Sequence, residues 1–345
     1  MVASPNASAG ATDLGTVAGW NGSNAWAVGV GHDAAFSMHW NGSTWSKVPV
    51  PVFGQRDVLE GLAMAGPHDV WGFGDFENAG GTERSLALHR TGGTWVKVAT
   101  PNVGAGDNDL SDASVISPTD IWAIGAGTVG AVKRRLVVHW NGIRWNKVDF
   151  PIVPVPVNEE ESITAVGPGD VWIALTAPDQ SSGNDRAVTY HLVSGTWHRV
   201  NLTQPSHGNV DPTDLLAFGP SSIWMVGFFA RGVSEFGLLE RWNGSDWVRF
   251  QGLHPDPVTN LAAVTGFGPH DVYAVGLDGT GSFVEHYDGN GWHQVATHDP
   301  AGADTFVLGG GSTASGSADH PVWAVGFTTK AGIPDRSLVE QSCPS

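Results

Sequence analysis

Short apolar runs alternate with glycine, proline, asparagine and aspartate throughout this chain. The stretch 59–99 contains four such runs, Leu59–Ala65, Asp69–Gly74, Ser85–His89 and Thr94–Ala99. Runs of about four to seven residues bounded by turn-forming residues are typical of β-strands. The pattern therefore predicts an all-β protein whose units contribute four antiparallel strands each.

The same unit returns along the whole chain. One marker is an aromatic residue in a Val-Trp-Ala-Val-Gly-like run, found at Trp26, Trp71, Trp122, Trp172, Trp224, Tyr273 and Trp323, with spacings of 45 to 52 residues. A second marker is the tryptophan that follows a glycine-containing turn, at Trp45, Trp95, Trp145, Trp197, Trp247 and Trp292. Seven copies of the first marker and six of the second predict seven repeats, the last one incomplete.

A single sheet of four short strands cannot bury both of its faces, but sheets packed in a ring can. The repeat length of about 50 residues is that of kelch-like blades. We therefore predict a seven-bladed β-propeller, one domain over residues 1–345, with blades at roughly 12–50, 57–100, 110–150, 161–202, 213–251, 259–297 and 304–342. The last repeat stops after its third strand, Ser337–Gln341, so residues 1–11 are the candidate for its fourth strand. The alternative is an open edge, which is an aggregation hazard.

Repetition separates scaffold residues from functional ones. The first strand of each repeat is expected to line the central channel, and the tryptophans of the second strand to pack between blades. A glycine follows the second-strand pattern at Gly29, Gly74, Gly125, Gly227, Gly276 and Gly326, which predicts a bend or a close approach there; Leu175 replaces it in the fourth repeat. Histidines recur at one third-strand position (His39, His89, His139, His191 and His286), so we expect half-buried strand residues rather than metal ligands.

Composition excludes several classes of function. The formal charge of −17 disfavours nucleic acid and anionic membrane surfaces as partners. The apolar runs have the length of strands, so no membrane span is expected. Cys343 is the only cysteine, which rules out an intramolecular disulfide and makes thiol catalysis an unattractive hypothesis. Low lysine content and a glycine- and tryptophan-rich repeat fit a secreted or cell-surface bacterial protein. We expect a monomer or a weak homo-oligomer.

The variable loops join the fourth strand of one blade to the first strand of the next, or the second strand to the third. Up-and-down connectivity places both sets on one face, which we call the loop-rich face, opposite the short-turn face. Loops that differ on a constant scaffold are typical of binding sites. We predict that ligand-binding residues come from this face and from the channel mouth: Asp13, Glu60, Asp75, Arg84, Asp112, Arg134, Glu161, Arg186, Asp214, Asn260 and Asp304.

Seven of these residues lie at or near the beginning of the first strands. They would form a mainly acidic ring around the channel mouth: Asp13, Glu60, Asp112, Glu161, Asp214, Asn260 and Asp304. Such a ring suits a cation, an amine or a hydroxyl-rich ligand; the alternative is a solvated rim. Crowded carboxylates raise one another's pKa, so an acid–base pair could come from Glu60, Asp112, Glu161, Asp214, His207 and His254. The segment with Asp107, Asp109 and Asp112 has alternating oxygen ligands but lacks the glycine and the distal glutamate of a complete calcium loop. We therefore expect no cofactor, with calcium as the one alternative.

The repeat over 268–292, GPHDVYAVG followed by SFVEHYDGNGW, resembles the seven-bladed bacterial lectins related to the Photorhabdus fucose-binding lectin. That resemblance implies sugar pockets between blades with tryptophan stacking on the sugar. The fourth strands depart from the family because they read Trp-x-Lys/Arg-Val without a second aromatic residue. The third-to-fourth turn also resembles a shortened Asp-box of sialidases, but the tyrosines Tyr190, Tyr273 and Tyr287 occupy repeat strand positions, which argues against that activity.

Three functions follow as hypotheses. The first is a carbohydrate-binding, lectin-like propeller that uses the loop-rich face and the channel mouth. The second is a lyase or hydrolase with an acid–base pair at the same mouth. The third is a protein-interaction scaffold. The repeats favour binding, whereas loops that differ between blades favour a single site.

Overall fold

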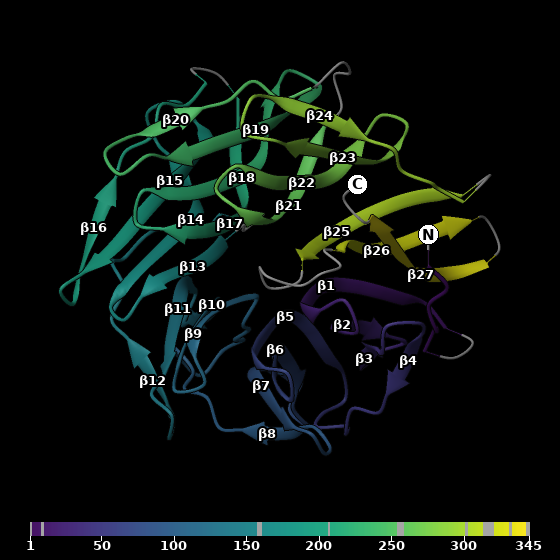
Figure 1. The fold of residues 1–345 in the computed structure, drawn as a ribbon. Coiled ribbons are helices and arrows are strands. Elements are labelled where there is room, and N and C mark those ends of the chain that lie inside the picture. Colours follow the sequence, from purple (N-terminus) through teal and green to yellow (C-terminus); the bar gives the residue numbers. More distant parts are fainter. Residues whose placement is uncertain are drawn as a thin grey trace.

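In a computed structural model the chain forms seven antiparallel β-sheets around a central channel (Figure 1). The structure describes residues 2–7, 10–156, 161–205, 208–253, 259–300, 303–312, 321–330 and 333–342. Each sheet is one blade, and its strands follow one another outward in chain order. The predicted seven-bladed β-propeller is confirmed. Within the described ranges, no helix has the length and apolar character needed to cross a membrane.

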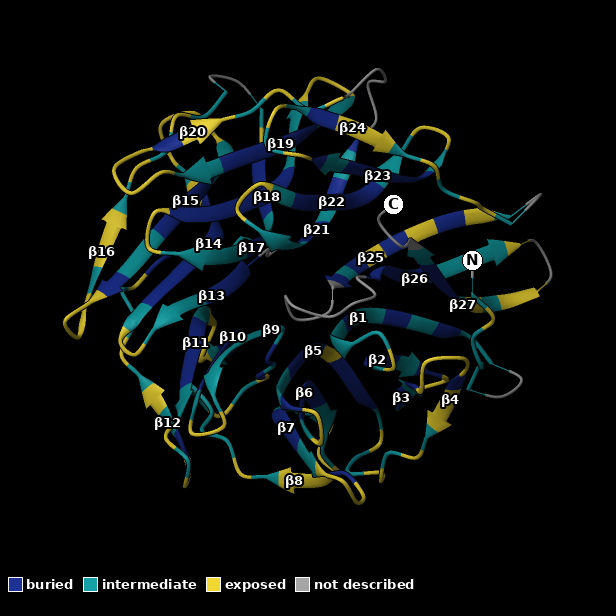
Figure 2. Ribbon diagram, viewed as in Figure 1, coloured by how far each residue is buried: buried dark blue, intermediate teal, exposed yellow. Residues whose placement is uncertain are grey.

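The strands divide into four concentric sets. The innermost strands are β1 (Thr12–Asn21), β5 (Asp57–Gly66), β9 (Asp112–Ser117), β13 (Glu161–Gly167), β17 (Val210–Gly219), β21 (Asn260–Gly268) and β25 (Asp304–Ser312). The second strands are β2 (Asn24–Gly31), β6 (Asp69–Glu77), β10 (Asp120–Val129), β14 (Asp170–Asp179), β18 (Ser222–Arg231), β22 (Asp271–Asp278) and β26 (Val322–Lys330). The third strands are β3 (Ala34–Trp40), β7 (Glu83–Thr91), β11 (Val132–Trp140), β15 (Asn184–Val193), β19 (Ser234–Trp242), β23 (Gly281–Tyr287) and β27 (Ile333–Ser342). The outer strands are β4 (Trp45–Val48), β8 (Val96–Val98), β12 (Trp145–Val148), β16 (Thr196–Val200), β20 (Trp247–Arg249) and β24 (Trp292–Val295), and they are the most exposed (Figure 2).

The N-terminal segment lies along β27, the outermost described strand of the seventh blade. The backbone N–H of Val2 donates to the carbonyl of Val339 (2.8 Å), and the N–H of Ser337 donates to Oδ1 of Asn6 (2.9 Å). Val2 and Ala7 also pack against the hydrophobic cluster between blades 7 and 1. Residues 2–7 therefore cover the edge whose closure the sequence left open, although without the regular pairing of a strand.

A glycine in the second strand and a β-bulge in the first strand occur together. In blade 2, a Cβ atom on Gly74 would lie 2.0 Å from the carbonyl oxygen of Val58, and Glu60 is the extra residue of the bulge. Blades 1, 5, 6 and 7 combine the same two features. Blade 4 has Leu175 in place of the glycine, and there Glu161 pairs directly with Leu175 without a bulge. The predicted close approach is confirmed, and its consequence is one extra residue at the channel wall.

The second-strand tryptophans pack between neighbouring blades, as expected. Trp71 is fully buried and contacts Trp140 and Trp145 of the next blade, with ring centroids 5.0 and 5.4 Å apart. Burying one tryptophan removes about 150–250 Å² from water. At ~25 cal/mol per Å² this contributes at most about 4–6 kcal/mol per residue. The belt of aromatic contacts is therefore a major source of the ring's stability.

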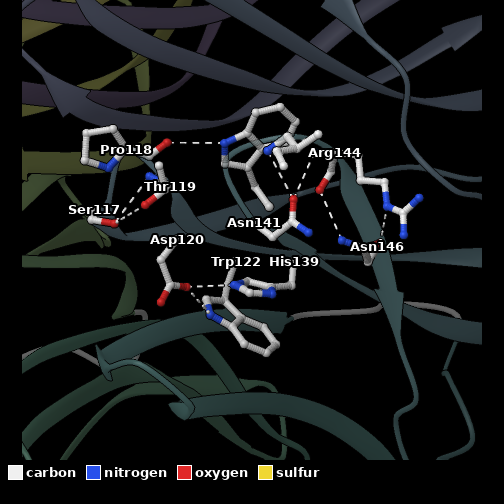
Figure 3. A network of polar contacts seen from close by, with 11 residues as sticks. Ser117, Pro118, Thr119, Asp120, Trp122, His139, Asn141, Arg144 and Asn146 are labelled. Atoms are coloured by element: carbon white, nitrogen blue, oxygen red, sulfur yellow. Dashed lines mark hydrogen bonds and ion pairs between the residues drawn. The ribbon is translucent and has the colours of Figure 1, made fainter.

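The recurring histidines pair with an aspartate and stack on the second-strand aromatic residue on the short-turn face, and Figure 3 shows the copy in blade 3. In blade 3, Nε2 of His139 lies 2.8 Å from Oδ1 of Asp120, and the imidazole stacks on Trp122 with centroids 4.4 Å apart. The indole N–H of Trp122 donates to the same aspartate oxygen (3.1 Å). Blades 2, 4 and 6 repeat the His–Asp contact with the pairs His89–Asp69, His191–Asp170 and His286–Asp271. These histidines serve the blade, as their repetition indicated.

Candidate functional site

A cavity of about 220 Å³ lies in the channel, where the inner strands of all seven blades meet. Its wall includes the carboxylates of Glu60, Asp112, Glu161 and Asp214. These are four of the six residues proposed from the sequence for acid–base chemistry. The other two, His207 and His254, lie outside the described residues. The structure therefore brings the acidic candidates together in one enclosed space.

The predicted ring of seven residues is only partly assembled, because the bulges shift the register of the first strands. The residues that the bulges add are Gly15, Glu60, Thr213, Ala262 and Leu308, and all five line the cavity. Asp13, Asn260 and Asp304 do not line it. The ring at the cavity is consequently a mixture of acidic, small and apolar residues, with its charge concentrated on blades 2 to 5.

Asp112 and Asp214 connect neighbouring blades. The hydroxyl of Ser162 lies between them, 2.7 Å from Oδ2 of Asp112 and 3.1 Å from Oδ1 of Asp214. Asp112 also accepts the backbone N–H of Ile163 (2.8 Å), and Asp214 that of Val264 (2.8 Å). Each aspartate thus binds the first strand of the next blade, and a structural function accounts for most of its hydrogen-bonding capacity.

Burial governs the ionisation of this pair. Burial raises the pKa of Asp112, against hydrogen bonds that favour its charged form. Burial and then the charge of Asp112 raise the pKa of Asp214. The hydroxyl of Ser162 has one hydrogen and can donate to only one of the two carboxylates at a time. A proton held by the pair relieves the repulsion between the two aspartates.

Glu60 is the carboxylate of the cavity that is most open to solvent. Its side chain is exposed at the wall of the cavity, and the inner strands of the other blades surround it. This enclosure and then the charge of Asp109 raise its pKa to about 7, while Arg56 acts in the opposite direction. Asp75 is buried nearby on β6, and burial followed by Glu83 raises its pKa to about 7 as well. Blade 2 therefore holds two carboxyl groups that exchange protons near neutral pH.

Glu161 is held by an ion pair with Arg135 of the preceding blade, in which both side chains are almost completely buried. It also accepts the hydroxyl of Ser111 (2.9 Å), and Arg135 donates to the carbonyl of Thr176 (3.0 Å). Removing one partner of such a buried pair leaves an uncompensated charge. Glu161 is therefore a structural connection between blades 3 and 4.

The segment considered for calcium does not gather its carboxylates. Asp107 accepts the backbone N–H of Glu83 (3.1 Å), and Asp109 accepts that of Ala126 (2.7 Å), whereas Asp112 faces blade 4. Within the described ranges, no group of three or more His, Cys, Asp or Glu side chains is placed to hold a metal. The arrangement gives no support for the calcium alternative.

Two of the predicted ligand-binding arginines bind backbone carbonyl groups of the following loop. Arg84 donates to the carbonyls of residues 104, 105 and 106 at 3.3, 2.8 and 2.9 Å. Arg186 donates to the carbonyls of Gly208 (3.0 Å) and Pro205. These arginines order the loops of the loop-rich face. Arg134, at the equivalent position of blade 3, lines a cavity described below.

A second cavity, of about 440 Å³, opens between blades 3 and 4 on the loop-rich face. Tyr190 of β15 lines it together with Arg186, Arg199, Asp179 and Gln204. The ring of Tyr190 is held by an edge-on contact at 5.1 Å with Phe150, which follows β12. The cavity therefore combines an oriented aromatic ring with fixed hydrogen-bonding groups.

Local hydrogen bonds position the polar side chains of this cavity. The carboxylate of Asp179 accepts the hydroxyl groups of Ser181 (2.7 Å) and Ser182 (2.8 Å), and the bonds from Ser181 contribute most to lowering its pKa. The amide of Gln204 makes two hydrogen bonds to the backbone of Ala187. Both groups are held in one orientation before any ligand arrives.

Tyr190 is not among the predicted ligand-binding residues, because all three tyrosines were assigned to repeat strand positions. The position directly before the recurrent third-strand residue holds Met38, Leu88, Val138, Tyr190, Glu240, Glu285 and Glu340 in the seven blades. Tyr190 is the one aromatic residue in that set. Alignment of the repeats on the histidine, rather than on the tryptophan, would have singled it out.

Comparisons with known proteins place the fold but not the ligand. No protein-family model matches the chain, and no curated protein matches it. Among solved structures it is similar to YCF48 bound to D1 peptide (15% identity, 93% of this chain and 91% of that chain, TM-score 0.58). It is also similar to a lectin of Aleuria aurantia in complex with Fucα1-6GlcNAc (13% identity, 84% of this chain and 98% of that chain, TM-score 0.55). A third similar structure is an ulvan lyase bound to a GlcA–Rha3S saccharide (10% identity, 98% of this chain and 97% of that chain, TM-score 0.64).

Identities this low show a shared propeller fold and nothing more specific. Fucose-binding lectins are among the structures with this fold, in line with the resemblance drawn from the sequence, but the Photorhabdus group itself is not identified. Enzymes that act on polysaccharides share the fold as well. The choice between binding and catalysis must therefore come from the sites of this chain.

Proposed function

We propose that this protein is a carbohydrate-binding propeller that uses its loop-rich face, with the cavity around Tyr190 as its principal site. The observation that carries the proposal is the composition of that cavity. Its volume of about 440 Å³ falls within the range of small-molecule sites, about 300–1,000 Å³. A tyrosine ring offers an apolar face for the C–H groups of a sugar, and its hydroxyl offers a polar edge.

The remaining groups supply both kinds of hydrogen-bonding partner that sugar hydroxyls require. Arg199 presents guanidinium donors, and the carboxylate of Asp179 retains acceptor sites beyond those that Ser181 and Ser182 occupy. Because Asp179 is already fixed, little ordering is needed on binding. Similar propellers that bind saccharides support this proposal as precedents for the fold.

The test is titration of the full-length protein with a glycan array, followed by calorimetry on the glycans that bind. Tyr190→Leu should weaken binding at least about tenfold, as expected for the loss of a stacking ring and a hydroxyl. Leucine is compatible with the blade, since Leu88 stands at the equivalent position of blade 2. The matched control is Arg144→Ala, an exposed residue of the short-turn face. Unchanged affinity of Tyr190→Leu for every bound glycan would exclude this site.

A second candidate function is catalysis in the channel cavity. It is favoured by one observation: Glu60 faces the cavity with a pKa raised to about 7, which suits a general acid or base near neutral pH. The assay is chromatographic detection of cleavage products from the glycans that bind. Glu60→Gln should abolish cleavage while leaving binding at the Tyr190 cavity unchanged. Absence of product from every bound glycan rejects this function.

A further inference from the structure

Another cavity lies beside the cavity around Tyr190. This third cavity, of about 120 Å³, lies at the outer part of blade 3, and its wall includes Arg134, Arg135, Lys147 and Asp149. Ile152 and Val153 line both cavities. Since the two spaces share this wall, they form two adjacent subsites along the loop that joins blades 3 and 4. We call them together the blade 3–4 groove.

The charges along this groove are predominantly positive. The first subsite contributes Arg186 and Arg199, and the second contributes Arg134 and Lys147. Five of the 17 lysine and arginine residues of the chain line the two cavities, against the single carboxylates of Asp179 and Asp149. One of the five, Arg135, is buried in its ion pair with Glu161, which leaves four cations for a ligand. Arg186 is anchored by backbone carbonyls, whereas Arg199 extends into solvent.

The equivalent cations of other blades are engaged in a different way. In blades 1 to 5, a lysine or arginine stands two residues after the tryptophan that begins the outer part of the blade. Lys47 lies over Phe36, Lys97 lies over Phe76, and Arg249 lies over Phe229. In the described structure, Lys147 and Arg199 show no such cation–π contact and instead line cavities. Among the described residues, it is in blades 3 and 4 that this repeated cation lines a cavity without covering a ring.

The groove is a positively charged exception on an otherwise acidic molecule. The chain carries a formal charge of −17, and the charged residues that line the channel cavity are all carboxylates. The molecule as a whole repels an anionic ligand, and the channel cavity does so locally, so the attraction has to come from the cations of the blade 3–4 groove acting at short range. Guanidinium groups bind carboxylate and sulfate with paired hydrogen bonds, and a lysine adds a compact positive charge.

We propose that the blade 3–4 groove binds a segment of an acidic polysaccharide, that is, a chain of sugars bearing carboxylate or sulfate groups. This inference rests on the proposed carbohydrate-binding function and names its ligand class. One sugar ring stacks on Tyr190 while Arg199 binds its anionic group. The next sugar crosses the exposed side chain of Ile152, and its anionic group meets Lys147 and Arg134. The tyrosine ring favours a saccharide over an acidic peptide.

The experiment is calorimetric titration of the full-length protein with four ligands of matched length. These are an oligogalacturonate, a sulfated oligosaccharide, a neutral oligosaccharide and an oligoglutamate. The acidic saccharides are expected to bind, with affinity that falls as salt rises. Arg199→Gln should weaken them at least about tenfold, and Lys147→Gln less, because a lysine pairs less specifically than an arginine. Lys97→Gln is the matched control, since it occupies the same strand position but covers Phe76.

The outcomes separate the two proposals. Binding of the neutral oligosaccharide that is weakened by Tyr190→Leu but not by Arg199→Gln overturns the acidic ligand and leaves carbohydrate binding standing. Binding of none of the three saccharides overturns both. Oligoglutamate binding as tight as that of the acidic saccharides overturns the saccharide specificity. Arg199 and Lys147 are exposed, so their substitution leaves the fold intact, and a thermal melt verifies this.

Discussion

Glu240 provides a test of how the propeller responds to pH. This residue of β19 is completely buried between blades 4 and 5, and within the described structure neither of its carboxyl oxygens has a hydrogen-bond partner. Burial raises its pKa from 4.5 to about 7, and the charge of Arg249 offsets only part of this effect. The folded protein therefore holds a proton on Glu240 that the unfolded chain releases.

The sign and size of the effect follow from proton linkage. A raised pKa in the folded state means that the folded protein binds more protons than the unfolded chain, so stability falls as pH increases. Each unit between the two pKa values corresponds to about 1.4 kcal/mol. Glu240 should therefore cost the folded state about 3 kcal/mol as pH rises from about 4.5 to about 7, with little further change above that range.

Glu240→Gln imitates the protonated carboxyl group at every pH. Urea unfolding at about pH 5 should give wild type and variant free energies of unfolding within about 1 kcal/mol of each other. At about pH 8 the variant should be more stable by about 3 kcal/mol. Glu77→Gln, in the half-buried end of β6, is the control and should follow the wild type. Parallel curves for wild type and Glu240→Gln would refute the reasoning.

Three further predictions concern the scaffold. Trp172→Ala empties a fully buried inter-blade position and should lower the free energy of unfolding by about 3–5 kcal/mol, whereas exposed Ile143→Ala should change it by less than about 0.5 kcal/mol in the same urea titration. Asp214→Ala removes the acceptor for the N–H of Val264, so hydrogen exchange at Val264 should accelerate at least tenfold; unchanged exchange would contradict the link between blades. Deleting residues 1–7 should uncover β27 and increase aggregation measured by light scattering, and a deletion variant that stays monodisperse would show that this segment does not protect the edge.

The repeated features of this protein were predictable because each is written within about 50 consecutive residues. The alternation of apolar and turn-forming residues defines the four strands, and the recurrence of Trp71 and its equivalents defines the number of blades. The second-strand glycines likewise indicated a close approach, and Gly74 shows it. The scaffold function of His139 followed from its recurrence alone, since a residue found in most blades belongs to the blade.

The candidate site depends on relations that no repeat contains. Glu60 is the extra residue of the bulge in blade 2, and blade 5 has its own bulge at Thr213, so the residue equivalent to Glu60 is Thr213 and not Asp214. The sequence could not show this equivalence, because a bulge arises from pairing between two strands. Ser162 likewise meets Asp214, which lies 52 positions further along the chain, and only the packing of blades brings them together.

The sequence by itself determined a ring of seven similar sheets, with the closure of the last one left open, since periodicity and buried aromatic residues specify a blade and its neighbours locally. The tertiary structure decided which of the unlike residues meet. It assigned Asp112 and Glu161 to connections between blades and opened a cavity beside Tyr190. The physical reason is that a blade is held by contacts near in sequence, whereas a cavity is bounded by loops of different blades whose relative position exists only after the ring has closed.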